Sequence, residues 1–133
     1  MTDRRIFYIE DDRDVAELCS IILTARGYHV ETAAAGKDGL KEFKKQKAKK
    51  QPFDIAILDY QLPDVDGLEV ARSLLKSTPD LPIVLITAKG SERIVAEALS
   101  IGVTRYVIKN TMDVYEHLLP EIVKAIQRDA GNQ

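Results

Sequence analysis

Four acidic residues directly follow two short apolar segments of the sequence. Glu10, Asp11 and Asp12 come after Ile-Phe-Tyr-Ile. Asp59 comes after Ile-Ala-Ile-Leu. Carboxylates that converge to about 4 Å repel by about 4 kcal/mol per pair at an effective dielectric constant of about 20. A hard divalent cation relieves this repulsion, and Mg²⁺ takes oxygen ligands from one or two carboxylates together with water and phosphate. The sequence therefore predicts a cation site formed by Glu10, Asp11 and Asp59.

A simpler role is open to two of these acids. Aspartate is favoured at the N-cap of a helix, where its side chain accepts backbone N–H groups, so Asp11 and Asp12 could serve only to cap the following helix. Asp59 has no such explanation, because it follows a fully apolar segment, and it favours the cation site. Without metal, we expect Glu10, Asp11 and Asp59 to titrate as a coupled group and not as independent residues.

Residues suited to binding an anion follow two further apolar segments. Thr87 and Ala88 come after Ile-Val-Leu-Ile, and Lys109 comes after Arg-Tyr-Val-Ile. Singly, Thr87 could be a helix N-cap and Lys109 an exposed lysine. Beside the acids, an ammonium and a hydroxyl would hold phosphoryl oxygens, and the small Ala88 leaves room for the group to enter. No Ser or Cys stands at the ends of these segments and both histidines lie elsewhere, so the sequence predicts a carboxylate as phosphoryl acceptor.

The elements that must position these residues alternate between short apolar segments and longer amphipathic stretches. Three of the short segments are continuously apolar and rich in β-branched residues, as expected of strands covered on both faces. Five such pairs in order predict an α/β fold, a doubly wound parallel sheet with right-handed crossovers and helices on both faces. Ligands of such sheets lie beyond the carboxyl ends of the strands, where the acids, Thr87 and Lys109 stand. The expected strands are residues 6–9, 28–31, 55–58, 83–86 and 105–108, of which the second and the fifth are the most polar and are placed at the edges.

Glycines and lysines indicate where helices end. Gly27 and Gly102 stand where the first and fourth helices should stop, and both are expected to adopt the left-handed conformation. Residues 41–51 contain six lysines. This run favours a solvated helix end followed by a loop over the alternative of a basic docking patch.

Pro120 falls inside the last amphipathic segment. Proline has no N–H and would break an uninterrupted helix at this point. The sequence therefore predicts a short turn over residues 113–119, a final helix from about 120 to 128, and a frayed tail over 129–133.

Composition limits the class of protein. The chain has 133 residues, 45% of them hydrophobic, which is enough for one domain with its own core. Nineteen Lys and Arg against 21 Asp and Glu give a net charge of −2, which argues against nucleic acid as a direct partner. The single cysteine, Cys19, excludes an intrachain disulfide. No apolar run reaches the roughly 18 residues of a membrane span and no signal peptide is evident, so we expect a cytoplasmic protein.

Taken together, these residues resemble the receiver domain of two-component response regulators, the CheY-like family. That family has an acidic pair ending the first strand, a phosphorylated Asp ending the third, Ser or Thr ending the fourth and Lys ending the fifth. The segment Asp-Tyr-Gln-Leu-Pro over 59–63, with Asp-Gly at 66–67, also resembles the family's sequence after the phosphorylated Asp. The matching positions here are Glu10 and Asp11, Asp59, Thr87 with Ala88, and Lys109.

The resemblance covers residues of about 4 to 128 and implies a single receiver domain over 1–133. It implies a flavodoxin-like (βα)5 fold, with a three-layer α/β/α arrangement and the strand order 2-1-3-4-5. It also implies Mg²⁺ or Mn²⁺ as cofactor, and a sensor histidine kinase or a histidine phosphotransfer protein as phosphoryl donor. No direct contact with nucleic acid is expected, and the output domain or protein is left open.

The resemblance further assigns roles to individual residues. Asp59 would be the nucleophile and phosphoacceptor. Asp11 and Asp59 would bind the cation directly together with the backbone carbonyl of Gln61, while Glu10 would act through water. The phosphoryl oxygens would be held by Thr87 and Lys109.

Three more residues match positions that modulate the phosphorylated state in the family. Tyr106 matches the aromatic residue whose rotation, coupled to Thr87, reports phosphorylation to the surface of the fourth helix, fifth strand and fifth helix. The alternative to this switch role is that Tyr106 simply packs flat on an edge strand. Gln61 and Lys89 match positions that tune the lifetime of the phosphate.

The sequence departs from the family pattern after Lys109. Receivers usually continue with a proline in a cis peptide, whereas Asn110 stands here. A cis bond before a residue other than proline costs about 2.5–4 kcal/mol, so we expect a trans Lys109–Asn110 peptide and a rearranged loop. With Asn110, Pro120 alters one side of the usual output surface.

Two other functions are compatible with the fold. An aspartyl-phosphate hydrolase commonly carries a second Asp two residues after its nucleophile, where this chain has Gln61. A phosphorylation-independent interaction module would need none of the acids, Thr87 or Lys109. Flavin or nucleotide binding is disfavoured because neither G-x-x-x-x-G-K-[ST] nor G-x-G-x-x-G occurs in the chain.

Overall fold

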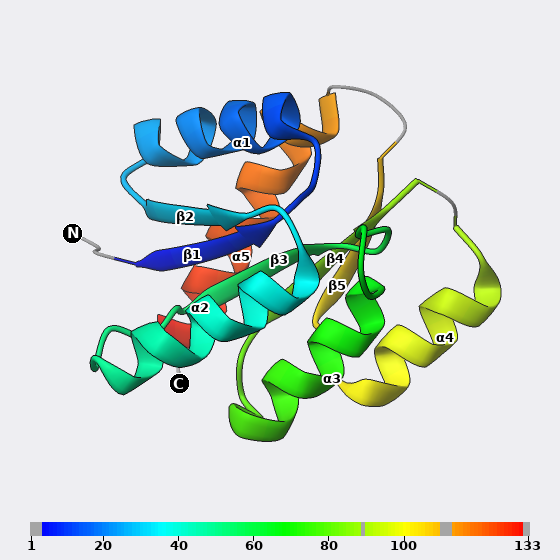
Figure 1. Cartoon of the computed structure of the whole chain (residues 1–133). Coiled ribbons are helices and arrows are strands. Elements are labelled where there is room, and N and C mark those ends of the chain that lie inside the picture. The colour runs from blue at the N-terminus through cyan, green and yellow to red at the C-terminus, as the bar shows by residue number, and fades with distance from the viewer. Residues whose placement is uncertain (1–3, 89, 110–112, 132–133) are drawn as a thin grey trace.

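The computed structural model describes residues 4–88, 90–109 and 113–131 (Figure 1). Five parallel strands form one sheet in the order β2-β1-β3-β4-β5, which confirms the flavodoxin-like α/β fold and its strand order. The strands are β1 (Arg5–Ile9), β2 (His29–Ala33), β3 (Ile55–Asp59), β4 (Ile83–Thr87) and β5 (Arg105–Ile108). The helices are α1 (Arg13–Ala25), α2 (Gly36–Ala48), α3 (Gly67–Ser77), α4 (Glu92–Ile101), the π-helix η1 (Val114–Leu118) and α5 (Leu119–Gly131).

Helices cover both faces of the sheet. In Figure 1, α1 and α5 lie on one face and α2, α3 and α4 on the other. The alternation of strand side chains creates two cores, as shown by Ile6 and Tyr8, which face α1, η1 and α5, while Phe7 and Ile9 face α2, α3 and α4. The sheet is thus the middle of three layers, and loops at its carboxyl edge remain accessible.

The polar strands lie at the edges, as expected from the sequence. All residues of β3 and β4 are buried, whereas no residue of β2 is buried and β5 buries only Val107. The second strand begins at His29 and extends to Ala33, slightly beyond the predicted segment.

Short polar side chains begin three of the helices. Asp12 caps α1 by accepting the N–H groups of Asp14 and Val15, so the capping role considered for this acid is correct. Asp66 caps α3 and Ser91 caps α4 in the same way. Thr87 therefore does not cap the fourth helix; it is the last residue of β4.

The predicted glycine conformations are confirmed. Gly27 and Gly102 have φ angles of 98° and 102°, in the left-handed region that a residue without Cβ adopts at little cost. Helix α2 continues to Ala48, so the first lysines of the 41–51 run belong to the helix and the last ones to the turn after it. The described lysines of this run are exposed, as a solvated helix end requires.

The prediction for the last segment was only partly correct. In place of a separate turn, the π-helix η1 runs directly into α5, and α5 extends to Gly131 where a frayed tail was expected. The Leu119 N–H donates to the Val114 carbonyl, five residues earlier. Pro120 cannot donate the next helical hydrogen bond, and the preceding turn widens, while Pro120 itself sits in the first turn of α5.

Two sequence predictions concern residues outside the described part of the chain. These are the trans peptide between Lys109 and Asn110 and the position of Lys89. Within the described residues, no helix is both long and apolar enough to cross a membrane.

Candidate phosphoacceptor site

Three carboxylates meet at the carboxyl edge of the sheet. One oxygen from each of Glu10, Asp11 and Asp59 lies within 4.8 Å of the others. Glu10 and Asp59 are each only 2% exposed, whereas Asp11 faces solvent. The parallel pairing of β1 with β3 explains this meeting, because Ile9 pairs with Leu58 and the next residue of each strand enters the same edge.

Lys109 joins the carboxylates from the end of the edge strand β5. Its Nζ lies 3.0 Å from Oδ2 of Asp59 and 3.7 Å from Oε1 of Glu10. Burial lowers the pKa of Lys109, but the hydrogen bond and the charge of Asp59, together with Glu10, outweigh burial and raise it above its ordinary value. The ammonium is therefore charged at neutral pH and offsets part of the acidic charge.

The pKa of the Glu10 carboxyl is displaced upward. Burial, and then the charge of Asp59, raise the pKa of Glu10 to about 7. Its Oε2 accepts the backbone N–H of Asp12 at 3.1 Å, and its Oε1 accepts the hydroxyl of Tyr8 at 3.1 Å. The charge of Asp59 thus acts on Glu10, and the coupled titration of the three acids stays a prediction.

Sequence reasoning missed Tyr8. Tyr8 is fully buried in β1, and burial raises its pKa far above the ordinary value, so its hydroxyl stays protonated as a donor. The spacing of Tyr8 and Glu10 could have revealed the contact, because residues two apart in a strand point to the same face of the sheet and Tyr8 precedes Glu10 by two.

The donor set fits a divalent cation. Asp59 Oδ1 is buried and has no hydrogen-bond partner among the described residues, an arrangement that costs free energy unless another group supplies the interaction. Two carboxylates beside it offer only oxygen atoms, the ligands that Mg²⁺ and Mn²⁺ prefer.

Backbone pairing brings Thr87 and Lys109 together. The Lys109 N–H donates to the Thr87 carbonyl at 2.8 Å, which continues the β4–β5 ladder by one residue. Thr87 is buried and Ala88 is exposed. An anion that reaches Asp59 therefore enters past a small residue, next to a hydroxyl and an ammonium.

The loop after β3 is closed at its base. The Gly67 N–H donates to the Tyr60 carbonyl at 2.8 Å. A Cβ on Gly67 would lie 2.5 Å from the Asp59 carbonyl oxygen, so only glycine fits where α3 begins. Gln61 lies in this loop, two residues beyond Asp59, and is exposed.

A second residue that the sequence did not reveal is Asp64. Its Oδ1 accepts the N–H of Gly36 and its Oδ2 the N–H of Lys37, both at 2.9 Å. These bonds, led by that of Lys37, lower the pKa of Asp64. Ala35, at the N-cap of α2, has no capping side chain, so the loop after β3 supplies the cap.

Tyr106 lies away from the carboxylates, on the edge strand β5, and is 39% exposed. It lines a shallow hollow between α4 and β5 together with Leu99, which is 57% exposed, and Ile108.

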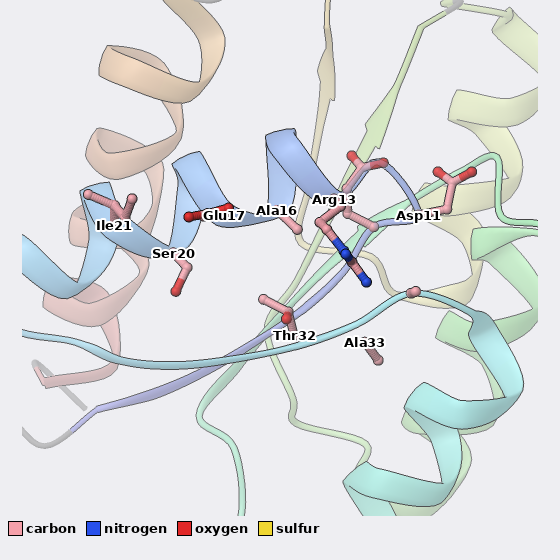
Figure 2. A pocket seen from close by; sticks show the side chains of 10 residues that line it. Asp11, Arg13, Ala16, Glu17, Ser20, Ile21, Thr32 and Ala33 are labelled. Atoms are coloured by element: carbon pink, nitrogen blue, oxygen red, sulfur yellow. The ribbon is translucent and has the colours of Figure 1, made fainter.

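An open hollow of about 490 Å³ adjoins the acidic cluster, between α1 and the end of β2. Figure 2 shows Arg13 reaching from the first turn of α1 toward the end of β2, with Asp11 beside it. Ile21, 60% exposed, lies at the far end of this hollow. The cluster is thus open on the α1 side.

Comparison with known proteins agrees with this geometry. The chain is 36% identical over 123 residues to the transcriptional regulatory protein AfsQ1 of Streptomyces coelicolor, covering 92% of this chain and 51% of that protein. It is 34% identical to the response regulator ArlR of Staphylococcus epidermidis, covering 92% and 52% of the two chains. The chain therefore spans about half the length of the curated relatives it matches.

Solved structures share the fold over nearly the whole chain. A CheY-like response regulator receiver domain protein of Methanospirillum hungatei superposes with a TM-score of 0.84 at 25% identity, covering 99% of this chain and all of the other. TrrA of Thermotoga maritima, solved in complex with Mg²⁺ and BeF, gives 0.75 at 31% identity, covering 92% and 97%. The family model described as the response regulator receiver domain matches residues 6–119. With the conjunction of acids, threonine and lysine at one sheet edge, this match shows that the chain belongs to the response regulator receiver domain family.

Proposed function

We propose that Asp59 is the phosphoacceptor of this receiver domain. The family has a phosphoacceptor role in two-component signalling, binds Mg²⁺ at an acidic cluster and is phosphorylated by histidine kinases. The observation that carries the assignment is the state of the Asp59 carboxylate. One of its oxygens is bound to Lys109, and the other is buried without a partner among the described residues.

The transfer step follows from this arrangement. A carboxylate oxygen of Asp59 attacks the phosphorus of a phosphohistidine, a new P–O bond forms and the P–N bond breaks. The imidazole leaves with the electron pair of that bond and takes a proton from water, and Asp59 becomes an acyl phosphate. Lys109 and the hydroxyl of Thr87 hold phosphoryl oxygens during the transfer.

We assign the cation ligands as Asp11 and Asp59, with the backbone carbonyl of Gln61, and place Glu10 in contact through water. The cation, when bound, neutralises charge on the carboxylates and on the phosphoryl oxygens. The exposure of Asp11 supports its place on the open side of the site. The hydrogen bonds that both Glu10 oxygens already accept, from Tyr8 and Asp12, support the indirect role of Glu10.

We propose that the hollow beside Asp11 and Arg13 receives the donor, a sensor histidine kinase or a histidine phosphotransfer protein. Its openness and its position next to the cluster support this.

For the response, we assign the switch surface to α4, β5 and α5 with Thr87 and Tyr106. Leu99 and Ile108, the exposed apolar side chains around Tyr106, support the assignment of this surface as the one that binds the output domain or protein. Gln61 and Lys89 are proposed to tune the lifetime of the phosphate.

We infer that residues 1–133 form one receiver domain, and that it signals through an output domain or protein and not by direct contact with nucleic acid. The net charge of −2 supports the latter point. The lone, buried Cys19 supports a cytoplasmic location, where thiols stay reduced.

The test uses acetyl phosphate as donor with Mg²⁺, and intact mass spectrometry as readout. The parent protein should gain one phosphoryl group with Mg²⁺ and none with excess EDTA. Asp59→Asn should gain none. Asp38→Asn, which alters an exposed acid of α2, should react like the parent. Equal labelling of Asp59→Asn and the parent would contradict the assignment.

A further inference from the structure

Tyr8 stands directly beneath the acidic cluster. It lies in the central part of β1, is 0% exposed, and points to the same face of the sheet as Glu10, two residues later. Its hydroxyl donates to Oε1 of Glu10 at 3.1 Å. The proposed reaction does not require a hydroxyl in this apolar core, so this contact needs its own explanation.

The surroundings of Glu10 show what the hydroxyl contributes. Oε2 of Glu10 accepts the Asp12 N–H at 3.1 Å. Oε1 has Lys109 at 3.7 Å, but that ammonium lies closer to Asp59, at 3.0 Å. Tyr8 therefore lies nearer to Oε1 than Lys109 does, and its hydroxyl is uncharged. A neutral donor fixes the direction of the carboxylate without cancelling the negative charge that attracts a divalent cation.

Removal of the hydroxyl leaves Oε1 of Glu10 without its hydrogen-bond donor. The Glu10 side chain can then turn toward Lys109, which draws the ammonium from Asp59. This change weakens the site for a cation, because it disturbs the carboxylates that would hold the ion.

We propose that Tyr8 is a positioning residue of the cation site, whose hydroxyl holds the Glu10 carboxylate beside Asp59 and thereby sets the affinity for Mg²⁺ or Mn²⁺. This inference rests on the proposed function, because it concerns the cation site assigned there. Groups that orient metal ligands typically change affinity by about 10–100-fold when removed, and we expect about tenfold for this hydroxyl.

The experiment measures Mn²⁺ binding by electron paramagnetic resonance, with Mg²⁺ as competitor, on Tyr8→Phe. Tyr28→Phe is the matched control, since Tyr28 is also buried and its hydroxyl donates to Gln127, at 2.8 Å, away from the cluster. Tyr8→Phe should bind Mn²⁺ about tenfold more weakly than the parent, and Tyr28→Phe should bind like the parent. Unchanged or tighter binding by Tyr8→Phe would overturn the proposal.

A double-mutant cycle separates positioning from support of the core. In a Glu10→Gln background, Tyr8→Phe should have almost no further effect on Mn²⁺ affinity, because the hydroxyl then has no carboxylate to hold. An equal loss in both backgrounds contradicts the proposal. If the Tyr8→Phe variant unfolds while the Tyr8→Phe/Glu10→Gln double variant stays folded, the hydroxyl acts through Glu10 and the proposal is supported. If both variants unfold, the hydroxyl serves only the core and the proposal is wrong. A parent that binds no Mn²⁺ refutes the proposed cation site itself, a result distinct from each of these.

Discussion

The ammonium of Lys109 reaches across the end of β4 to lie 3.0 Å from Oδ2 of Asp59, at the end of β3. The same ammonium is 3.7 Å from Glu10, so one cation faces two buried acids. In the absence of metal, Lys109 is the counter-ion of the site. The net charge of this cluster stays negative, which leaves a reason for a divalent cation to bind.

Replacement of Lys109 should destabilise the metal-free protein. Lys109→Met leaves two buried carboxylates without their counter-ion, and we expect a loss of about 1–2 kcal/mol in the free energy of unfolding, less than for a fully buried pair because the lysine is partly exposed. Urea unfolding in EDTA measures this change. Lys76→Met, at an exposed lysine of α3, serves as control and should behave like the parent.

Stability of the metal-free protein should fall as the pH rises through neutrality. The pKa of Glu10 is raised to about 7 in the folded state, so protonated Glu10 stabilises the fold fully below its unfolded pKa, and this contribution is lost as the pH rises through about 7. We expect a decrease of about 2 kcal/mol from this residue between pH of about 5 and 8. Urea unfolding in EDTA at several pH values tests it. The slope should flatten in Glu10→Gln; an unchanged slope would assign the effect to other groups.

A methyl group at the start of α3 should be poorly tolerated. A Cβ on Gly67 would lie 2.5 Å from the Asp59 carbonyl oxygen and 2.9 Å from the Tyr60 Cα, both backbone atoms. Gly67→Ala should therefore cost about 1–3 kcal/mol, measured by thermal unfolding. Gly90→Ala is the comparison, since among the described residues its Cβ would meet only the flexible Ile108 side chain. Equal costs for the two variants would show that the backbone beside Asp59 can move.

The thiol of Cys19 should be inert in the folded protein. Cys19 is 1% exposed, and burial, followed by the charge of Glu10, raises its pKa to about 12. Because the thiolate is the reactive form, a thiol reagent such as DTNB should label the native protein at least about a hundredfold more slowly than the urea-unfolded chain. Fast labelling under native conditions would indicate that α1 opens readily.

The sequence allowed the core of the site to be predicted because parallel strands share one carboxyl edge. The residues that follow each apolar segment must meet there, which is why Glu10, Asp11, Asp59 and Lys109 could be placed together from the sequence alone. Their neighbours Thr87 and Ala88 followed by the same reasoning.

Other features depend on contacts that no local pattern encodes. The cap that Asp64 gives to Gly36 joins residues 28 positions apart, in two loops whose approach depends on the packing of α2 against α3. The π-helix before Pro120 was read as a turn, because a proline predicts an interruption but not how the backbone accommodates it. Tyr8 entered the sequence analysis only as part of the apolar segment 6–9, because its ring belongs to the core and only its hydroxyl belongs to the site.

The loop between Tyr60 and Gly67 has a further consequence for engineering. The hydrogen bond between Gly67 and Tyr60 holds the two ends of the loop together. The exposed residues inside the loop, Gln61 among them, can therefore be replaced without opening its base. Asp64 is the exception, since a graft that lacks an acid there would uncap a neighbouring helix. A library that varies the exposed residues of this loop while keeping Asp64, the α3 cap Asp66 and Gly67 would alter the entrance to the acceptor carboxylate and leave both helix caps in place.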